Sequence, residues 1–386
     1  MSEIAYLDYA ATSAIRPPEV VEAVAAYLRD IGATPGRATH QRSLAASRIV
    51  FRCRRALAEL FGITGDPGRI AFQLNATHAL NAALHGVLQP GDAVVRTEYD
   101  HNSVRRPVSL LRGRGIEERV LRGRPDGGVD LDEARALVTG AGRPARMLVL
   151  PHASNVLGSV LPVRELAEMA HDAGALVLVD AAQSAGHLPV DVEALGIDLL
   201  AFTGHKGLLG PQGTGGLWVR EGVEVGVGVA GGTGGDSLPM EMPDAYPDHL
   251  EAGTQNGPGI SGLLAGVEWL MAHGVATLWD RELALKAELY RRLAALPGVR
   301  VRSPAAPEGV GIVTITSDRI APAELASRLE SEFGVLTRAG LHCAPEAHRL
   351  LGTLETGAVR FSLGWATTAE DIQQAARAVA ALNGGE

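Results

Sequence analysis

The chain has 386 residues, of which 46% are hydrophobic and 20% charged, so it can bury a large core in roughly two to three domains. Its formal net charge of -9 argues against non-specific nucleic-acid binding, and its two cysteines form neither a disulfide framework nor a zinc site. Neither a secretory leader nor an uncharged apolar run of about 18 residues is evident, so we expect a cytoplasmic protein that does not enter membranes.

The first part of the chain alternates between helical and strand-like patterns. Helical spacing of apolar residues predicts helices just after Pro18, over residues 43–61 and over residues 76–88. Short apolar runs predict later strands, with a helix over 163–173 among them, at residues 93–96, 147–150, 176–179, 199–202 and 216–219. Strands that alternate with helices favour an α/β fold with a mostly parallel sheet, covered on both faces.

The second part of the chain predicts a different region. Residues 231–259 are rich in glycine, proline and aspartate, and we interpret them as an active-site loop and a crossing between regions. Two helices are expected after this loop, over 260–272 and 277–296. A smaller α+β unit follows, with strands near 311–316 and 358–362 and a closing helix over 368–382. We therefore assign residues 15–255 to a large domain, and residues 1–14 with 256–386 to a small domain.

Two polar residues follow neighbouring predicted strands. Asp180 directly follows the run at 176–179, and Lys206 follows the run at 199–202. Ligands of parallel sheets bind at the carboxyl ends of the strands, so we expect both side chains in one site. A lysine that holds pyridoxal phosphate (PLP) as a Schiff base, and an acid that keeps the pyridine nitrogen protonated, are what PLP chemistry requires. The plain alternatives are a solvated lysine and a carboxylate that caps a helix.

Cys343 lies far downstream, in the segment 338–345. A cysteine thiolate is a nucleophile, and nearby Arg338 or His342 could favour that form. The alternative is a small buried hydrophobe, which is our interpretation of Cys53 in its helical run. The glycine-containing segment around Cys343 indicates instead an exposed, mobile nucleophile. Together with PLP chemistry, it points to an enzyme that acts on a sulfur amino acid.

Several further segments occur in a specific order along the chain. They are YLDYAATS (6–13), NATHALN (75–81), HASNVLG (152–158), VDAAQSAG (179–186), TGHKG (203–207), EAGTQN (251–256) and VRFS (359–362). In this order the chain resembles the fold-type I PLP enzymes of the class V aminotransferase group, and within it the cysteine desulfurases, almost from end to end. The compact cysteine segment is similar to the second desulfurase group, which is related to the selenocysteine lyases. The resemblance implies a large domain with a mostly parallel sheet of the seven-stranded type, and a smaller α+β domain.

The resemblance also implies how the cofactor would be held. Lys206 would hold PLP as a Schiff base and would later move the Cα proton. Asp180 would pair with the pyridinium nitrogen, and Gln183 would hydrogen-bond the phenolic oxygen of the ring. His101 would stack on the ring and could pass protons, although a lone loop histidine is more often structural. The phosphate would be bound by Thr77, Thr203, His205 and the backbone N–H of His78, with Thr254 reaching in from a second subunit.

A site for the substrate follows from the same resemblance. Arg360 matches the arginine that binds the substrate carboxylate, for which a guanidinium fork is well suited. Asn155 would lie near the same carboxylate and the cofactor oxygen. Arg338 matches a further active-site arginine, with a surface ion pair as the alternative. The resemblance implies no metal.

The resulting hypothesis is a homodimeric, PLP-dependent cysteine desulfurase. It would convert L-cysteine to L-alanine and leave a persulfide on Cys343, from which the sulfur passes to a thiol or a protein acceptor. A selenocysteine lyase is the nearest rival hypothesis, since selenium leaves more easily and its loss need not depend on Cys343. A C–S lyase or aminotransferase for another amino acid is a second rival, and a PLP-binding sulfur carrier without turnover is a third.

Overall fold

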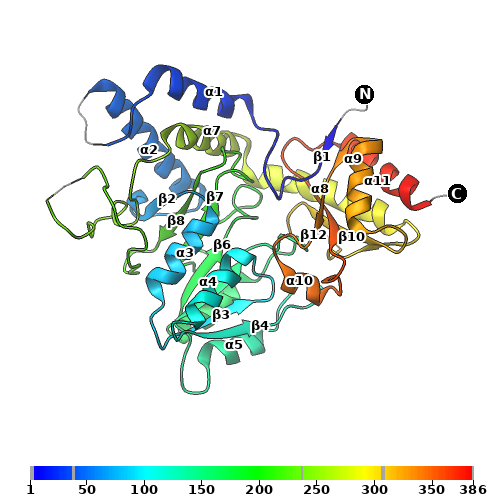
Figure 1. The fold of residues 1–386 in the computed structure, drawn as a ribbon, viewed down its shortest axis with the longest axis horizontal. Helices are drawn as coiled ribbons and strands as arrows, with labels where there is room; N and C mark the ends of the chain where they lie inside the picture. The colour runs from blue at the N-terminus through cyan, green and yellow to red at the C-terminus, as the bar shows by residue number, and fades with distance from the viewer. Residues whose placement is uncertain (1–3, 37–39, 236–237, 306–308, 385–386) are drawn as a thin grey trace.

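The structure is a computed structural model that describes residues 4–36, 40–235, 238–305 and 309–384. Figure 1 shows a larger body around one sheet and a smaller body that contains both chain termini. The larger sheet has seven strands and the smaller one four.

The seven-stranded sheet confirms the predicted α/β fold. Its strands, in spatial order, are β2 (Ile70–Gln73), β8 (Gly215–Val219), β7 (Leu199–Thr203), β6 (Leu176–Asp180), β5 (Met147–Pro151), β3 (Ala93–Thr97) and β4 (Glu117–Leu121). The strand β8 runs antiparallel to its two neighbours, and the other pairs are parallel. The central strands are continuous apolar runs because both faces of the sheet are covered.

Alternate residues of each strand enter two different cores, as the pleat of a strand requires. In β5, Leu148 and Leu150 belong to one core, and Met147 and Val149 belong to the other. The first core packs under α2 (Gln41–Leu60), α6 (Val163–Asp172) and α7 (Gly257–His273), and the second under α3 (Ala76–Val87) and α4 (Asn102–Arg112). The helix α5 (Leu131–Thr139) lies beside α6 and β4.

The smaller body is built on the order β12 (Arg338–Gly340), β13 (Ala358–Ser362), β10 (Ile312–Ser317) and β9 (Val299–Val301), all antiparallel. Its helices are α8 (Val275–Ala294), α9 (Pro322–Phe333), α10 (Pro345–Leu350) and α11 (Ala369–Gly384). The N-terminal strand β1 (Ala5–Tyr6) pairs with β11 (Val335–Leu336), so the first residues of the chain join this body (Figure 1).

The division into domains stays a prediction. The second segment of the assigned small domain begins at residue 256, yet α7 packs against α1 (Pro18–Ala26) and α2 of the larger body. A short π-helix, η1 (Tyr27–Ile31), and a short 3₁₀-helix, η2 (Pro67–Arg69), complete the described elements.

Among the described residues, no single helix is long and apolar enough to cross a membrane. The pair α7 and α8 passes such a test jointly, by length and composition only, but it bends by 80° at the break.

Candidate active site

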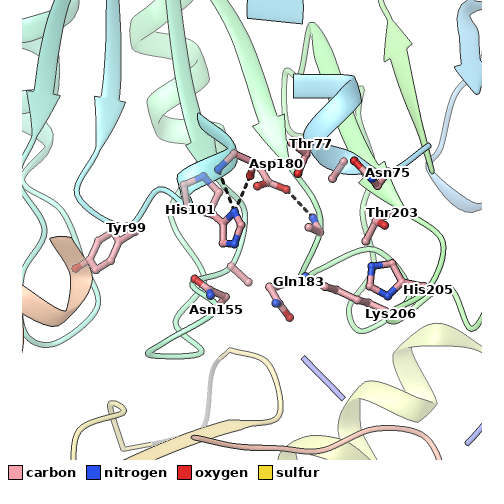
Figure 2. A pocket seen from close by; sticks show the side chains of 15 residues that line it. Asn75, Thr77, Tyr99, His101, Asn155, Asp180, Gln183, Thr203, His205 and Lys206 are labelled. Atoms are coloured by element: carbon pink, nitrogen blue, oxygen red, sulfur yellow. Dashed lines mark hydrogen bonds between the residues drawn. The ribbon is translucent and has the colours of Figure 1, made fainter. Parts of the chain in front are cut away.

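A pocket opens at the carboxyl ends of β5, β6 and β7, where the parallel strands place their following residues together. Figure 2 shows its lining, in which most of the predicted site residues meet: Thr77, His101, Asn155, Asp180, Gln183, Thr203, His205 and Lys206. Asn75 and Tyr99 line it as well and were not predicted. In the described ranges no cluster of histidine, cysteine and acidic residues is arranged to hold a metal ion.

Lys206 and Asp180 both line this pocket, and each affects the pKa of the other electrostatically. Burial lowers the pKa of Lys206 to about 8, assisted by Arg360 and Arg338, while Asp180 acts in the opposite direction. Burial raises the pKa of Asp180, against the Ala182 N–H that donates to it at 2.9 Å and against Lys206. A lysine with such a pKa supplies free amine near neutral pH, which makes it a good nucleophile. A buried carboxylate needs a cationic partner.

His101 ends the loop before α4 and caps that helix. Its Nδ1 accepts from the Ser103 N–H at 3.1 Å and lies 2.8 Å from Ser103 Oγ. Burial lowers the pKa of His101 to about 4, and Lys206 adds to the effect. The ring is therefore neutral, with its proton on Nε2, and it lines the pocket, as Figure 2 shows.

Polar groups at one end of the pocket suit an anion. Thr203 Oγ1 is buried and has no hydrogen-bond partner among the described residues, so it needs an acceptor or donor from a ligand. Thr77 lies in the first turn of α3, where the helix dipole favours negative charge. The residue that caps α3 is Asn75, whose Oδ1 accepts from the His78 N–H at 3.0 Å. To bind the phosphate as predicted, the His78 N–H would have to give up its hydrogen bond to Asn75 Oδ1.

A second cavity of about 660 Å3 lies next to this pocket. Thr77 borders both, and the wider cavity also contains His78 and Thr254. Thr254 is exposed in the loop before α7. Within one chain, His78 and Thr254 therefore face the neighbouring cavity, and the role of Thr254 in a second subunit stays a prediction.

The predicted carboxylate site lies across the pocket, on the smaller sheet. Arg360 in β13 is almost fully buried, with its Nη2 at 2.9 Å from Asp8 Oδ1 and its Nη1 at 3.1 Å from the carbonyl oxygen of Asn155. Its Nε finds no acceptor within the described part of the chain. Arg338 is the direct neighbour of Arg360 in the β12–β13 pair, so two like charges stand on one face of the sheet. Such an arrangement favours an anion between them.

Cys343 is exposed, as expected, but its segment is anchored by hydrogen bonds. Asn155 Nδ2 donates to the His342 carbonyl at 2.7 Å, and the Asn102 N–H donates to the Cys343 carbonyl at 2.8 Å. Both ring nitrogens of His342 are occupied, by His348 and by the Arg338 carbonyl. His342 is therefore not free to activate the thiol. Cys53 is fully buried, which confirms its interpretation as a small hydrophobe.

The N-terminal segment 8–13 contacts the site at several points that the sequence did not predict. Asp8 pairs with Arg360, and the carbonyl of Ala10 accepts from Gln183 Nε2 at 3.1 Å. Further contacts come from Thr12 Oγ1, 3.1 Å from His205 Nδ1, and from Ser13 Oγ, which donates to the Lys206 carbonyl at 2.8 Å. The motif YLDYAATS was the only sign in the sequence that this segment belongs to the site. Its partners lie between 173 and 352 positions further along the chain, so no local pattern indicates them.

Comparisons with known proteins agree with this geometry. Residues 5–375 match the family described as Aminotransferase class-V. A protein of Methanothermobacter thermautotrophicus described as a probable cysteine desulfurase is 34% identical over 378 residues, which cover 95% of this chain and 92% of that protein. The apo structure of a cysteine desulfurase from Thermococcus onnurineus NA1 superposes with a TM-score of 0.92 at 31% identity, covering 99% of this chain and 95% of that one. A crystal structure of a cysteine desulfurase from Escherichia coli gives a TM-score of 0.87 at 27% identity, with 97% and 94% covered.

Proposed function

The chain belongs to the class-V aminotransferase family, and we propose that it is a PLP-dependent cysteine desulfurase that converts L-cysteine to L-alanine. The observation that carries this proposal is the placement of Lys206 and Asp180 in one pocket, with Cys343 near it. Lys206 and Asp180 lie on the large sheet, and the exposed Cys343 lies close enough to affect the pKa of Lys206 electrostatically. A cysteine nucleophile beside a lysine–acid pair suits sulfur removal from an amino acid.

The residues present fit PLP. Lys206 would hold the cofactor, Asp180 would face its ring nitrogen and Gln183 its phenolic oxygen, while His101 would cover the ring. The orphaned Thr203 hydroxyl, together with Thr77 and His205, would bind the phosphate. When bound, PLP supplies an electron sink for the charge that develops at the substrate Cα.

Arg360 and Lys206 would then act on the substrate. The guanidinium of Arg360 binds the carboxylate, and Asp8 keeps that guanidinium oriented through the 2.9 Å bond. Lys206 Nζ takes the proton from Cα, which its pKa of about 8 allows near neutral pH. Asn155 links the two sides of the site, because its carbonyl oxygen accepts from Arg360 and its Nδ2 donates to the His342 carbonyl.

Sulfur transfer belongs to Cys343. Its thiolate attacks the substrate sulfur, a new S–S bond forms as the C–S bond breaks, and the bonding electrons of the C–S bond stay with the carbon fragment. That fragment takes up one proton at Cβ, where the sulfur was, and regains one at Cα, and it leaves as alanine. The sulfur remains as a persulfide on Cys343, exposed for transfer to a thiol or protein acceptor.

We infer a homodimer on separate grounds. The cavity that contains Thr254 and His78 opens beside the proposed phosphate end of the pocket. A second copy of the chain could place its own Thr254 there.

The experiment measures two things separately: the lysine to which PLP is attached and the fate of the substrate sulfur. Lys206 and Lys286 are the only lysines in the sequence, so borohydride reduction followed by peptide mass analysis should find PLP on Lys206 alone. L-cysteine should then yield alanine and one added sulfur atom on Cys343. A Cys343→Ala variant that makes alanine at the wild-type rate would contradict the sulfur step. Retained turnover of selenocysteine in that variant would indicate a selenocysteine lyase instead.

A further inference from the structure

Three buried side chains beside Cys343 form a line of hydrogen bonds that the reaction above does not use. His342 Nδ1 lies 3.1 Å from His348 Nε2, and His348 Nδ1 lies 2.8 Å from Thr353 Oγ1. At the other end, His342 Nε2 lies 3.1 Å from the Arg338 carbonyl oxygen. We call His342, His348 and Thr353 the histidine chain.

One arrangement of protons satisfies every link of the histidine chain with both rings neutral. A carbonyl only accepts, so His342 Nε2 must carry its proton and donate to Arg338. His342 Nδ1 is then an acceptor, so His348 donates from Nε2 and accepts at Nδ1 from the Thr353 hydroxyl. Burial lowers the pKa of His342 to about 3 and that of His348 to about 4, which keeps both rings neutral at physiological pH.

The helix that bears His348 is itself fixed to the larger body. Glu346 in the first turn of α10 lies 2.5 Å from Arg96 Nη1 and 3.1 Å from Arg105 Nε. The side chains of Arg96 and Glu346 are largely buried, so solvent screens this ion pair little. His348 follows two residues later and is fully buried. Its imidazole is therefore held in place and can restrain the neighbouring segment through the hydrogen bond to His342.

That segment has an unfavourable backbone. The φ angle is +49° at His342 and +57° at Cys343, in the left-handed region that residues with a Cβ atom rarely adopt. Such a conformation persists only where the surroundings impose it. The carbonyls of the two residues are bound by Asn155 and Asn102, as described above. The His342 side chain is restrained as well, at Nδ1 by His348 and at Nε2 by the Arg338 carbonyl.

We propose that His348 is a positioning residue for Cys343: by donating to His342 Nδ1, it holds the turn at 342–343 in the conformation that presents the thiol to the substrate. The consequence for rate rests on the proposed desulfurase function. A displacement of about 1 Å in a reacting group can lower a rate on the order of 100-fold, so a loosened turn should slow sulfur transfer without weakening substrate binding.

The test compares two substitutions of His348 in the holoenzyme. His348→Leu keeps bulk but deletes both hydrogen bonds, whereas His348→Gln can still donate to His342 and accept from Thr353. We expect kcat for alanine formation to fall about 10- to 100-fold in His348→Leu, with KM within about twofold of wild type. Most of the loss should be recovered in His348→Gln. His171→Leu is the matched control, since His171 on α6 binds Asp198 outside the pocket and its loss should leave kcat unchanged.

A second measurement reports on the turn without any turnover. Amide hydrogen exchange in peptides that cover 338–346 should be at least about tenfold faster in His348→Leu than in wild type, and near wild type in His348→Gln. Unchanged exchange, an unchanged kcat in His348→Leu, or a His348→Gln variant as impaired as His348→Leu would overturn the proposal. If the wild type makes no alanine, the desulfurase function fails, and the exchange result alone still decides whether His348 holds the turn.

Discussion

The two halves of the active site are held in place in different ways. On the large sheet, Asp180 ends β6 and Lys206 follows the end of the paired strand β7, so the pairing of the two strands brings them together. On the smaller body, the exposed Cys343 lies in a turn with two consecutive left-handed residues, which hydrogen bonds to backbone and side chains hold in place. Strand pairing therefore positions Asp180 and Lys206, whereas the nucleophile depends on individual polar contacts.

The largest effect is expected for Lys206→Ala, which removes the amine from the part of the active site that lies on the large sheet. Without the amine, PLP should no longer be fixed by borohydride, and kcat should fall at least on the order of 10³-fold. The absorbance spectrum and alanine assay measure both. A variant that retains borohydride-fixed PLP would place the cofactor on Lys286, the one other lysine of the sequence.

Arg360→Lys tests the link between the halves, since Arg360 contacts Asp8 and the Asn155 carbonyl from the smaller sheet. A lysine cannot reproduce the guanidinium fork, so we expect KM for L-cysteine to rise about 10- to 100-fold, with a smaller change in kcat. Steady-state kinetics at saturating PLP measure the effect. Asp8→Asn keeps the shape of the partner and should give an intermediate KM; a wild-type KM in Arg360→Lys would remove Arg360 from the carboxylate site.

Acid should lower the free energy of unfolding through buried histidines in both halves of the active site. Burial lowers the pKa of His101, His205 and His348 to about 4 and that of His342 to about 3, below the value of about 6.5 expected in the unfolded chain. The unfolded chain therefore binds more protons between about pH 6.5 and 4, and the free energy of unfolding falls as the pH falls through that window. Urea unfolding near pH 7 and near pH 5 measures the difference. Equal stability at the two pH values would contradict this expectation and would show that Asp100 and Asp180, whose pKa values burial raises, offset the effect of the rings.

The smallest effect is expected for Cys53→Ala, which sharpens the contrast between the two cysteines. Cys53 is fully buried in α2, whereas Cys343 is exposed. The substitution should lower the free energy of unfolding by about 1 kcal/mol and leave alanine formation unchanged. In native protein, a thiol reagent should label Cys343 and reach Cys53 only after unfolding. Rapid native labelling at Cys53 would contradict the burial.

The large sheet could be predicted well because its strands are buried on both faces. The runs at 147–150 and 199–202 lie inside β5 and β7. The strand β4 was missed because Glu117, Glu118 and Arg119 give this edge strand a charged pattern. The helix α4 was missed because it contains Pro107 and several arginines.

The site could be predicted only where a strand end places a residue. Asp180 and Lys206 are examples, since sheet topology brings them together. The contact of Asp8 with Arg360, and the histidine chain, could not be predicted, because they depend on loop geometry and on residues far apart in the sequence. The resemblance to desulfurases supplied the remaining site residues, and their roles stay predictions.

The contacts of segment 8–13 make the site a meeting point of the two ends of the chain. Asp8 binds Arg360 and the Ala10 N–H donates to Ser362 Oγ, each across 352 positions of sequence. During synthesis on the ribosome, the N-terminal segment emerges first and must wait for β13, one of the last elements, before these bonds can form. Closing so long a loop is a late event in folding. A nascent chain can therefore complete the large sheet well before it acquires a working carboxylate site.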